Sequence, residues 1–135
     1  MSEENVEKIR AALEAWSRGD WEEALKDISP ECIFDNSTTI GEWRGVHRGH
    51  DEIRRLWQRI TEPWQQVELR VDEVIEAQDD LVVTTGRSRF IGRDGIELRG
   101  PTRSGWVWRF RDGQIVHLAF YNSLDDALEA TGLRE

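Results

Sequence analysis

The sequence predicts an α+β domain in which a bent antiparallel sheet wraps around three N-terminal helices, with a short helix at the C-terminal end. Apolar residues recur at helical spacing in three segments before Pro63, and they alternate at strand spacing over most of residues 67–121. The connections between the later strands are short enough only for hairpins. With 135 residues, 38% of them apolar, the chain is expected to form a single domain over residues 1–135 with a sizeable core.

Three amphipathic stripes predict the helices. The first stripe covers residues 6–16 at spacings of three and four. Asp20 is expected to cap a second helix, because Glu23 three residues later completes a D-x-x-E capping pattern, and this helix is expected to end at Pro30. A third stripe over residues 53–60 predicts the third helix.

The first strands show one irregularity that matters for shape. A short strand is predicted over Cys32–Asn36, followed by a glycine-punctuated loop over residues 37–49. The apolar residues of Val67–Val71 alternate with charged ones, but the apolar set resumes at Val74 and not at Glu73. This slip of one residue predicts a bulge that bends the strand.

The rest of the chain is predicted to form a meander of hairpins and a terminal helix. Turns are expected at Asp79-Asp80 and Asp112-Gly113, and Gly100-Pro101 is expected to be an irregular point within a long strand. Ser123, with Asp126 three residues later, is expected to cap the terminal helix. The strands predicted here are Leu81–Ile91, Ile96–Phe110 and Ile115–Tyr121.

Composition excludes several classes of partner. A net charge of -9 repels phosphate backbones, so we expect no nucleic acid. The apolar runs are too short for a membrane span, and the acidic start lacks the features of a signal peptide, so we expect a cytoplasmic protein. The single cysteine, Cys32, has no partner for a disulfide and is expected to be a small buried side chain.

Four short segments carry a resemblance to a known family. The segments are Trp16–Asp20, Arg48–Arg54, Trp108–Val116 and Asp125–Leu133. In this order and spacing they resemble the NTF2-like superfamily, and within it the SnoaL-like group of small bacterial proteins. The resemblance spans nearly the whole chain and implies a cone-shaped fold with a pocket at its wide end. The superfamily includes isomerases, cyclases, dehydratases, transport factors and proteins without known activity, so the fold alone selects no function.

One member of the superfamily, ketosteroid isomerase, provides a pattern of catalytic residues with which this sequence can be compared. Its cavity holds a tyrosine, a general-base aspartate and a protonated aspartate. Counting along this chain places Ala12, Asn36 and Trp106 at those positions. Because all three differ from the pattern, we do not expect that mechanism here. Asp35 is a candidate base only if the first strand is shifted by one residue.

Asp35 is nevertheless the leading candidate for acid-base chemistry. It follows Ile33 and Phe34 on a strand that the resembled fold places at the cavity, where burial would raise the pKa of its carboxyl group. Asn36 or Asn122 would donate a hydrogen bond to an oxyanion. The alternative is that Asp35 is a solvated residue at a strand end or a cap for the following loop.

Two histidines superficially suggest a metal site. His47 and His50 have H-x-x-H spacing, with Asp51 adjacent. At the start of a helix, His50 and Asp51 are explained as cap and first-turn residues, and a catalytic metal needs three well-placed ligands. We therefore expect no metal and no other cofactor.

The sequence contains seven tryptophans and one tyrosine. Trp106 and Trp108 share one face of their strand with Phe110 and oppose the helix stripes that contain Trp16 and Trp57. Such rings fill a core or line a cavity, and four indoles in one layer are hard to pack without a gap. The residues expected to bind a ligand are Trp16, Phe34, Trp57, Trp106, Trp108, Leu118 and Phe120.

The last strand presents two alternative faces. Alternation places His117, Ala119 and Tyr121 on one face and Leu118, Phe120 and Asn122 on the other. The resemblance favours the second set inside the cone, whereas a bulge would reverse the two faces.

Together these features predict a pocket protein for a small apolar ligand that is aromatic or polycyclic. One version is an enzyme that performs isomerase- or cyclase-type acid-base chemistry without a cofactor. The alternative is a non-catalytic carrier, a sensor or a dimeric interaction module, which needs the walls of the pocket but no base.

The outer face of the sheet predicts an assembly. If the tryptophans point inward, Val83, Thr85, Val107 and Ala119 form an apolar outer face. A face-to-face homodimer would bury it, with Arg87, Arg109 and His117 around the rim. The alternative is a monomer in which arginine stems cover these small side chains.

Overall fold

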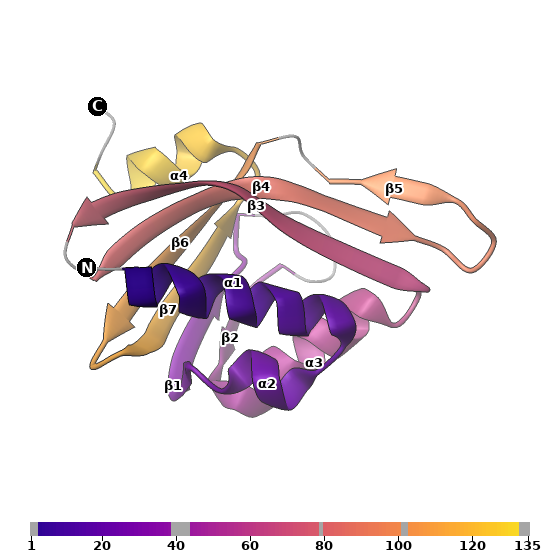
Figure 1. Cartoon of the computed structure of the whole chain (residues 1–135), viewed down its shortest axis with the longest axis horizontal. Coiled ribbons are helices and arrows are strands. Elements are labelled where there is room, and N and C mark those ends of the chain that lie inside the picture. Colours follow the sequence, from indigo (N-terminus) through magenta and orange to yellow (C-terminus); the bar gives the residue numbers. More distant parts are fainter. Residues whose placement is uncertain (1–2, 39–43, 79, 101–102, 133–135) are drawn as a thin grey trace.

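The computed structural model describes residues 3–38, 44–78, 80–100 and 103–132, and these residues form the α+β architecture that the sequence predicts (Figure 1). The helices are α1 (Glu3–Arg18), α2 (Trp21–Leu25), α3 (Gly49–Thr61) and α4 (Leu124–Ala130). The strands are β1 (Ile28–Asp35), β2 (Val46–Arg48), β3 (Gln66–Gln78), β4 (Leu81–Ile91), β5 (Glu97–Arg99), β6 (Ser104–Arg111) and β7 (Gln114–Tyr121). Among these described residues, no helix is both long enough and apolar enough to cross a membrane.

The strands form one curved sheet. The strand order is β2-β1-β7-β6-β4-β3, and β5 pairs with the C-terminal end of β4. The pairs β3-β4, β4-β6 and β6-β7 are antiparallel, which confirms the predicted meander. β1 joins this sheet by pairing in parallel with β7, so the position of the first strand depends on a segment that lies far away in the sequence.

The predicted bulge in β3 is confirmed. The register with β4 jumps from Val71 opposite Gly86 to Glu73 opposite Thr85, so Asp72 is the extra residue. At this bend β3 and β4 approach so closely that a Cβ atom on Gly86 would collide with the carbonyl oxygen of Arg70. The bend therefore needs both the extra residue in β3 and the missing side chain in β4.

Two predictions about element boundaries are wrong, and both fail because of pairing between distant segments. α2 ends at Leu25, and Ile28 already lies in β1, where it pairs with Ile115 of β7 and is buried. Pro30 therefore lies within a strand and does not end a helix. The predicted loop 37–49 contains the short strand β2, which pairs with β1, while residues 39–43 lie outside the described residues.

The predicted long strand over residues 96–110 is two strands. β5 pairs with residues 89–91 of β4, and β6 pairs with residues 81–86 of the same strand. Because β4 bends between these two stretches, one continuous partner strand cannot follow it. Gly100 lies at the break, as predicted for an irregular point; Asp79 and Pro101 lie outside the described part of the chain.

The helices cover opposite faces of the sheet (Figure 1). α1, α2 and α3 lie on one side of β3 and β4, and α4 lies on the other. Ser123 caps α4 as predicted, because its side chain accepts a hydrogen bond from the backbone N–H of Asp126. On this outer side the helix packs against a compact cluster, whose buried members are Leu81, Val83, Val107, Ala119, Leu124 and Ala127.

The position of α4 corrects the expectation of an exposed apolar outer face. Val83, Thr85, Val107 and Ala119 are all buried within a single chain. Gly105 permits this contact, since a Cβ atom there would lie 2.6 Å from the Cβ of Ala127. The chain's own last helix thus covers Val83, Val107 and Ala119, the apolar part of the surface that motivated the predicted dimer.

Candidate functional site

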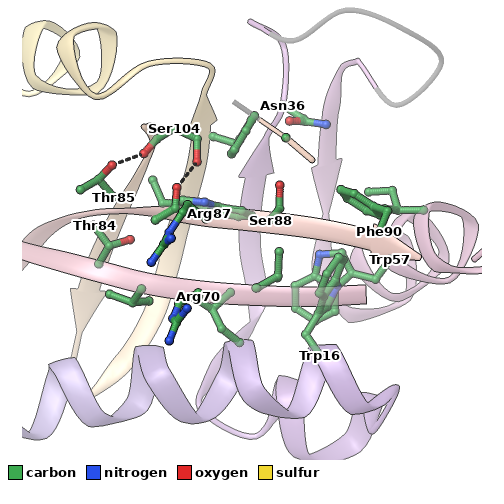
Figure 2. Close-up of a pocket in the computed structure, with 18 of the residues that line it drawn as sticks. Trp16, Asn36, Trp57, Arg70, Thr84, Thr85, Arg87, Ser88, Phe90 and Ser104 are labelled. Atoms are coloured by element: carbon green, nitrogen blue, oxygen red, sulfur yellow. Dashed lines mark hydrogen bonds between the residues drawn. The ribbon is translucent and has the colours of Figure 1, made fainter. Parts of the chain in front are cut away.

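A cavity of about 240 Å³ lies inside the cone, between α1, α3 and the inner face of the sheet (Figure 2). Its lining comes from segments far apart in the sequence, which the bent β3-β4 pair brings together. The aromatic lining residues are Trp16, Phe34, Trp57, Trp64, Phe90, Trp106 and Phe120. The aliphatic ones are Leu13, Ile60, Leu69, Val71 and Leu98.

The aromatic rings meet mainly at steep angles. The centroids of Trp16 and Trp57 are 6.1 Å apart with an interplanar angle of 85°, and those of Trp106 and Phe120 are 4.9 Å apart at 69°. Edge-to-face contact is a favourable geometry for aromatic pairs, but large flat rings held this way leave unfilled space between them. The wide end of the cone therefore remains open although its walls are apolar.

Five of the seven residues expected to bind a ligand line this cavity. They are Trp16, Phe34, Trp57, Trp106 and Phe120. Trp108 and Leu118 lie deeper and border only a small hollow of about 10 Å³ beneath it. Both are almost completely buried, so in this structure they support the floor of the cavity.

Several lining residues were missed because they depend on the bend in the sheet. Phe90 lies beyond Gly86 on β4, and its ring centroid is 5.4 Å from that of Trp64, which follows α3. Leu98 belongs to β5 and pairs there with Phe90, at the end of β4 that lies beyond Gly86. The alternation of Thr84, Ser88 and Phe90 along β4 is the signal that could have identified this wall.

Polar groups occupy limited parts of the wall. Thr84 accepts a hydrogen bond at 3.0 Å from the indole N–H of Trp108, which packs beneath the cavity. Thr85 and Ser104 are satisfied by the sheet itself, because Thr85 donates to the carbonyl of Ser104 and Ser104 donates to the carbonyl of Gly86 (Figure 2). The remaining neutral polar residues in the lining are Asn36 and Ser88.

Two arginines line the cavity from neighbouring strands, Arg70 on β3 and Arg87 on β4. Arg87 binds Asp72 through two hydrogen bonds of 2.8 and 3.0 Å. These bonds hold the pKa of Asp72 below its usual value. The pair thus links the bulged residue of β3 to the neighbouring strand β4.

The structure does not bring Asp35 to the cavity. Phe34 and Asn36, on either side of it, line the cavity, and Asp35 pairs in register with Ala119 on the outer side of β7. Its carboxylate accepts hydrogen bonds from the backbone N–H and the hydroxyl group of Ser37, at 2.9 and 2.5 Å. The cap for the following loop, which was the alternative interpretation, describes this geometry.

The pKa of Asp35 also differs from the value that a base role needs. Partial burial favours a higher pKa, but the two hydrogen bonds from Ser37 and the nearby His117 together hold the pKa below its usual value. Burial lowers the pKa of His117 and raises that of Tyr121. Asp35, His117 and Tyr121 thus form an electrostatic group on the outer face of the sheet.

Other candidates are also located away from the cavity. Asn122 is exposed just after β7, although Phe120 does point inward as the resemblance implies. The ring of His50 contacts the carbonyl oxygen of Ile28 at 2.6 Å and does not cap α3.

Cys32 is buried, as the sequence predicts, and burial raises the pKa of its thiol to about 12. Among the described residues, no group of three or more potential ligands is arranged around a metal position.

Comparison with known proteins agrees with this architecture. The family model of the SnoaL-like domain matches residues 9–118 of the chain. No curated protein matches the sequence at a significant level.

Several solved structures have the same fold. An NTF2-like protein of unknown function from Burkholderia pseudomallei is 22% identical, with a TM-score of 0.74 over 96% of this chain and 97% of that one. TerC, co-crystallised with polyporic acid, is 21% identical, with a TM-score of 0.76 over 96% and 98%. A putative polyketide cyclase from Xanthomonas campestris is 18% identical, with a TM-score of 0.72 over 95% and 96%.

Proposed function

Because the chain belongs to the SnoaL-like domain family of the NTF2-like superfamily, we propose that its cavity binds an apolar small molecule with aromatic or polycyclic rings. The observation that carries this proposal is the cavity of about 240 Å³ with seven aromatic side chains in its wall. A pocket that is mainly aromatic, with a few polar groups, is typical of sites for small organic ligands. TerC, which has the same fold, was co-crystallised with polyporic acid, and this supports a small-molecule ligand here.

Binding is better supported than acid-base catalysis. Proton transfer near neutral pH normally uses a carboxylate or an imidazole, and the described lining residues supply hydroxyl, amide, indole and guanidinium groups. Asp35, the proposed base, lies on the other face of the sheet. An enzymatic version would keep Asn36 in the cavity as a hydrogen-bonding group. The described residues therefore support a carrier or sensor ahead of an isomerase or cyclase.

The test uses tetralin, an aromatic bicyclic hydrocarbon, titrated into the protein by calorimetry. We expect a dissociation constant on the order of 0.1 mM or tighter for the wild type. Val71→Trp should abolish binding, because Val71 lines the cavity and the indole would occupy it. Val46→Trp is the matched control, since Val46 is exposed on β2 and does not line the cavity. Equal binding to both variants, or no binding to the folded wild type, would refute the proposal.

Two further proposals concern the oligomeric state and the cellular location of the protein. A homodimer would use the part of the outer face beside α4, around His117 and Tyr121 on β7, which are only partly buried in the single chain. Sedimentation at micromolar concentration should then give twice the chain mass of 15.7 kDa, and a single unchanging species at 15.7 kDa would contradict the dimer.

A cytoplasmic location is proposed from the sequence, and fractionation of cells that express the chain tests it.

A further inference from the structure

Two buried polar groups in the cavity wall can donate a hydrogen bond to a ligand: one has no partner among the described residues, and the other is engaged there as an acceptor. The first is the indole nitrogen of Trp16, a residue that is only 5% exposed. The second is the hydroxyl group of Thr84, which is 1% exposed and whose oxygen already accepts the hydrogen bond from Trp108. Both residues line the cavity, Trp16 from α1 and Thr84 from β4 (Figure 2).

A buried donor without an acceptor costs free energy, and native proteins rarely keep one without a reason. The neighbours of Trp16 are the indole rings of Trp21 and Trp57, both at steep angles to it. The face of an aromatic ring is a weaker acceptor than an oxygen atom. The protein interior therefore leaves the Trp16 N–H poorly satisfied, whereas an oxygen atom of a ligand would satisfy it.

Thr84 has the same need for a different reason. The N–H of Trp108 occupies a lone pair of the hydroxyl oxygen at 3.0 Å, which leaves the hydroxyl proton to donate elsewhere. A hydroxyl group that accepts one hydrogen bond is also polarised into a stronger donor. The sheet satisfies the neighbouring hydroxyl groups of Thr85 and Ser104 with its own carbonyl groups, so Thr84 differs from them.

We propose that Trp16 and Thr84 are the ligand's polar anchors, and that the natural ligand is an aromatic compound carrying a carbonyl or a similar acceptor oxygen. This inference rests on the proposed function and narrows its ligand class. An aromatic hydrocarbon would fill the cavity but leave both donors unsatisfied. An aromatic ketone of the same skeleton would satisfy at least one of them.

The test compares tetralin with 1-tetralone, which have the same two rings and differ by one carbonyl group. The measured quantity is the ratio of the two dissociation constants in each protein, which cancels differences in packing that affect both probes. Trp16→Phe removes the N–H and keeps an aromatic ring, and Thr84→Val removes the hydroxyl at nearly constant shape. We expect at least one of these variants to lose about fivefold of the preference for 1-tetralone. Phe90→Leu is the control: it alters the cavity wall but removes no donor, so the ratio should stay unchanged.

Indole N–H resonances of the wild type provide a second measurement that does not depend on the folding of a variant. With 1-tetralone bound, the resonance of the Trp16 indole proton should move further downfield than with tetralin. If Thr84 alone holds the carbonyl group, this shift is absent, and Thr84→Val instead reduces the preference for 1-tetralone. If the ratio is the same in the wild type and both variants, and the Trp16 resonance responds equally to the two probes, the proposal is overturned. If neither probe binds to the folded wild type, the proposed function fails instead, which is a separate outcome.

Discussion

The two faces of the same sheet are packed in opposite ways. On the outer face, α4 covers small side chains, and the cluster around Val83, Val107 and Ala119 is closed, with each of these residues at most 7% exposed. On the inner face, the helices meet tryptophan and phenylalanine side chains, and a cavity of about 240 Å³ remains. The outer face has the smaller side chains but the tighter packing.

The difference shows that the distance between layers, more than the size of the side chains, decides whether a cavity remains. Gly105 lets α4 come so close that a single added methyl group would touch Ala127. On the inner side, the bulge at Asp72 bends β3 and β4, and the residues beyond Gly86 become the wall of a cone. Rings held apart by this curvature cannot close the wide end.

Matched leucine substitutions give the largest expected contrast between the faces. Leu81→Ala should destabilise the protein by about 3 kcal/mol, because Leu81 is 2% exposed in the closed outer cluster. Leu69→Ala should cost only about 1 kcal/mol, because Leu69 already borders empty space. Chemical denaturation of both variants measures the difference. Equal losses would mean that the two faces are packed alike.

Overpacking gives the next contrast. Gly105→Ala should cost about 2 kcal/mol, since the added Cβ would lie 2.6 Å from Ala127 and 3.0 Å from the backbone oxygen of Ser123. Gly92→Ala is the control, because its nearest neighbour at 2.8 Å is the end of the flexible Asp94 side chain. Thermal unfolding should rank Gly105→Ala well below Gly92→Ala. The reverse order would contradict the close approach of α4.

Asp35→Asn tests which face carries ligand chemistry. Asp35 lies on the outer side with His117, so the affinity for tetralin should stay within about twofold of the wild-type value. Stability should fall slightly, because an amide accepts the hydrogen bonds from Ser37 less strongly than a carboxylate. Calorimetric titration of the two proteins side by side measures this. A large loss of affinity would place Asp35 at the cavity after all.

The outer face should also produce a small pH dependence. Burial lowers the pKa of His117 in the folded protein, so its contribution to stability is present above its ordinary pKa of 6.5 and is lost as pH falls through the lower folded value. Asp35, whose folded pKa is also lowered, remains ionised between pH 7 and pH 5. Urea unfolding at these two pH values should show a loss in the wild type that His117→Gln reduces. An equal loss in both proteins would assign the effect to other groups.

The sequence predicted the features that depend on local pattern. The caps at Asp20 and Ser123, the bulge near Asp72 and the shared face of Trp106 and Trp108 on β6 follow from spacing along one segment. For β7, spacing left two alternative faces, and the resemblance favoured the one that contains Phe120. The boundaries that it missed depend on long-range pairing, such as Ile28 with Ile115.

The candidate site was predicted in the same uneven way. Trp16, Trp57 and Trp106 follow from periodicity, whereas Asp35 required a shift of β1 by one residue that the structure does not have. The polar role of Thr84 could not be predicted, because it arises from the contact with Trp108 on a neighbouring strand. Periodicity predicts on which face of its helix or strand a residue lies, but not which side chain of another element it contacts there.

Nuclear Overhauser effects between bound tetralin and the protein test the central claim most directly. We expect contacts from the probe to side chains of the inner wall, among them Trp16, Phe34 and Phe90. No contacts are expected to Val107, Ala119 or Leu124 beneath α4. Contacts to those outer residues, or none at all at a probe concentration that saturates the calorimetric titration, would contradict the assignment of the inner cavity as the binding site.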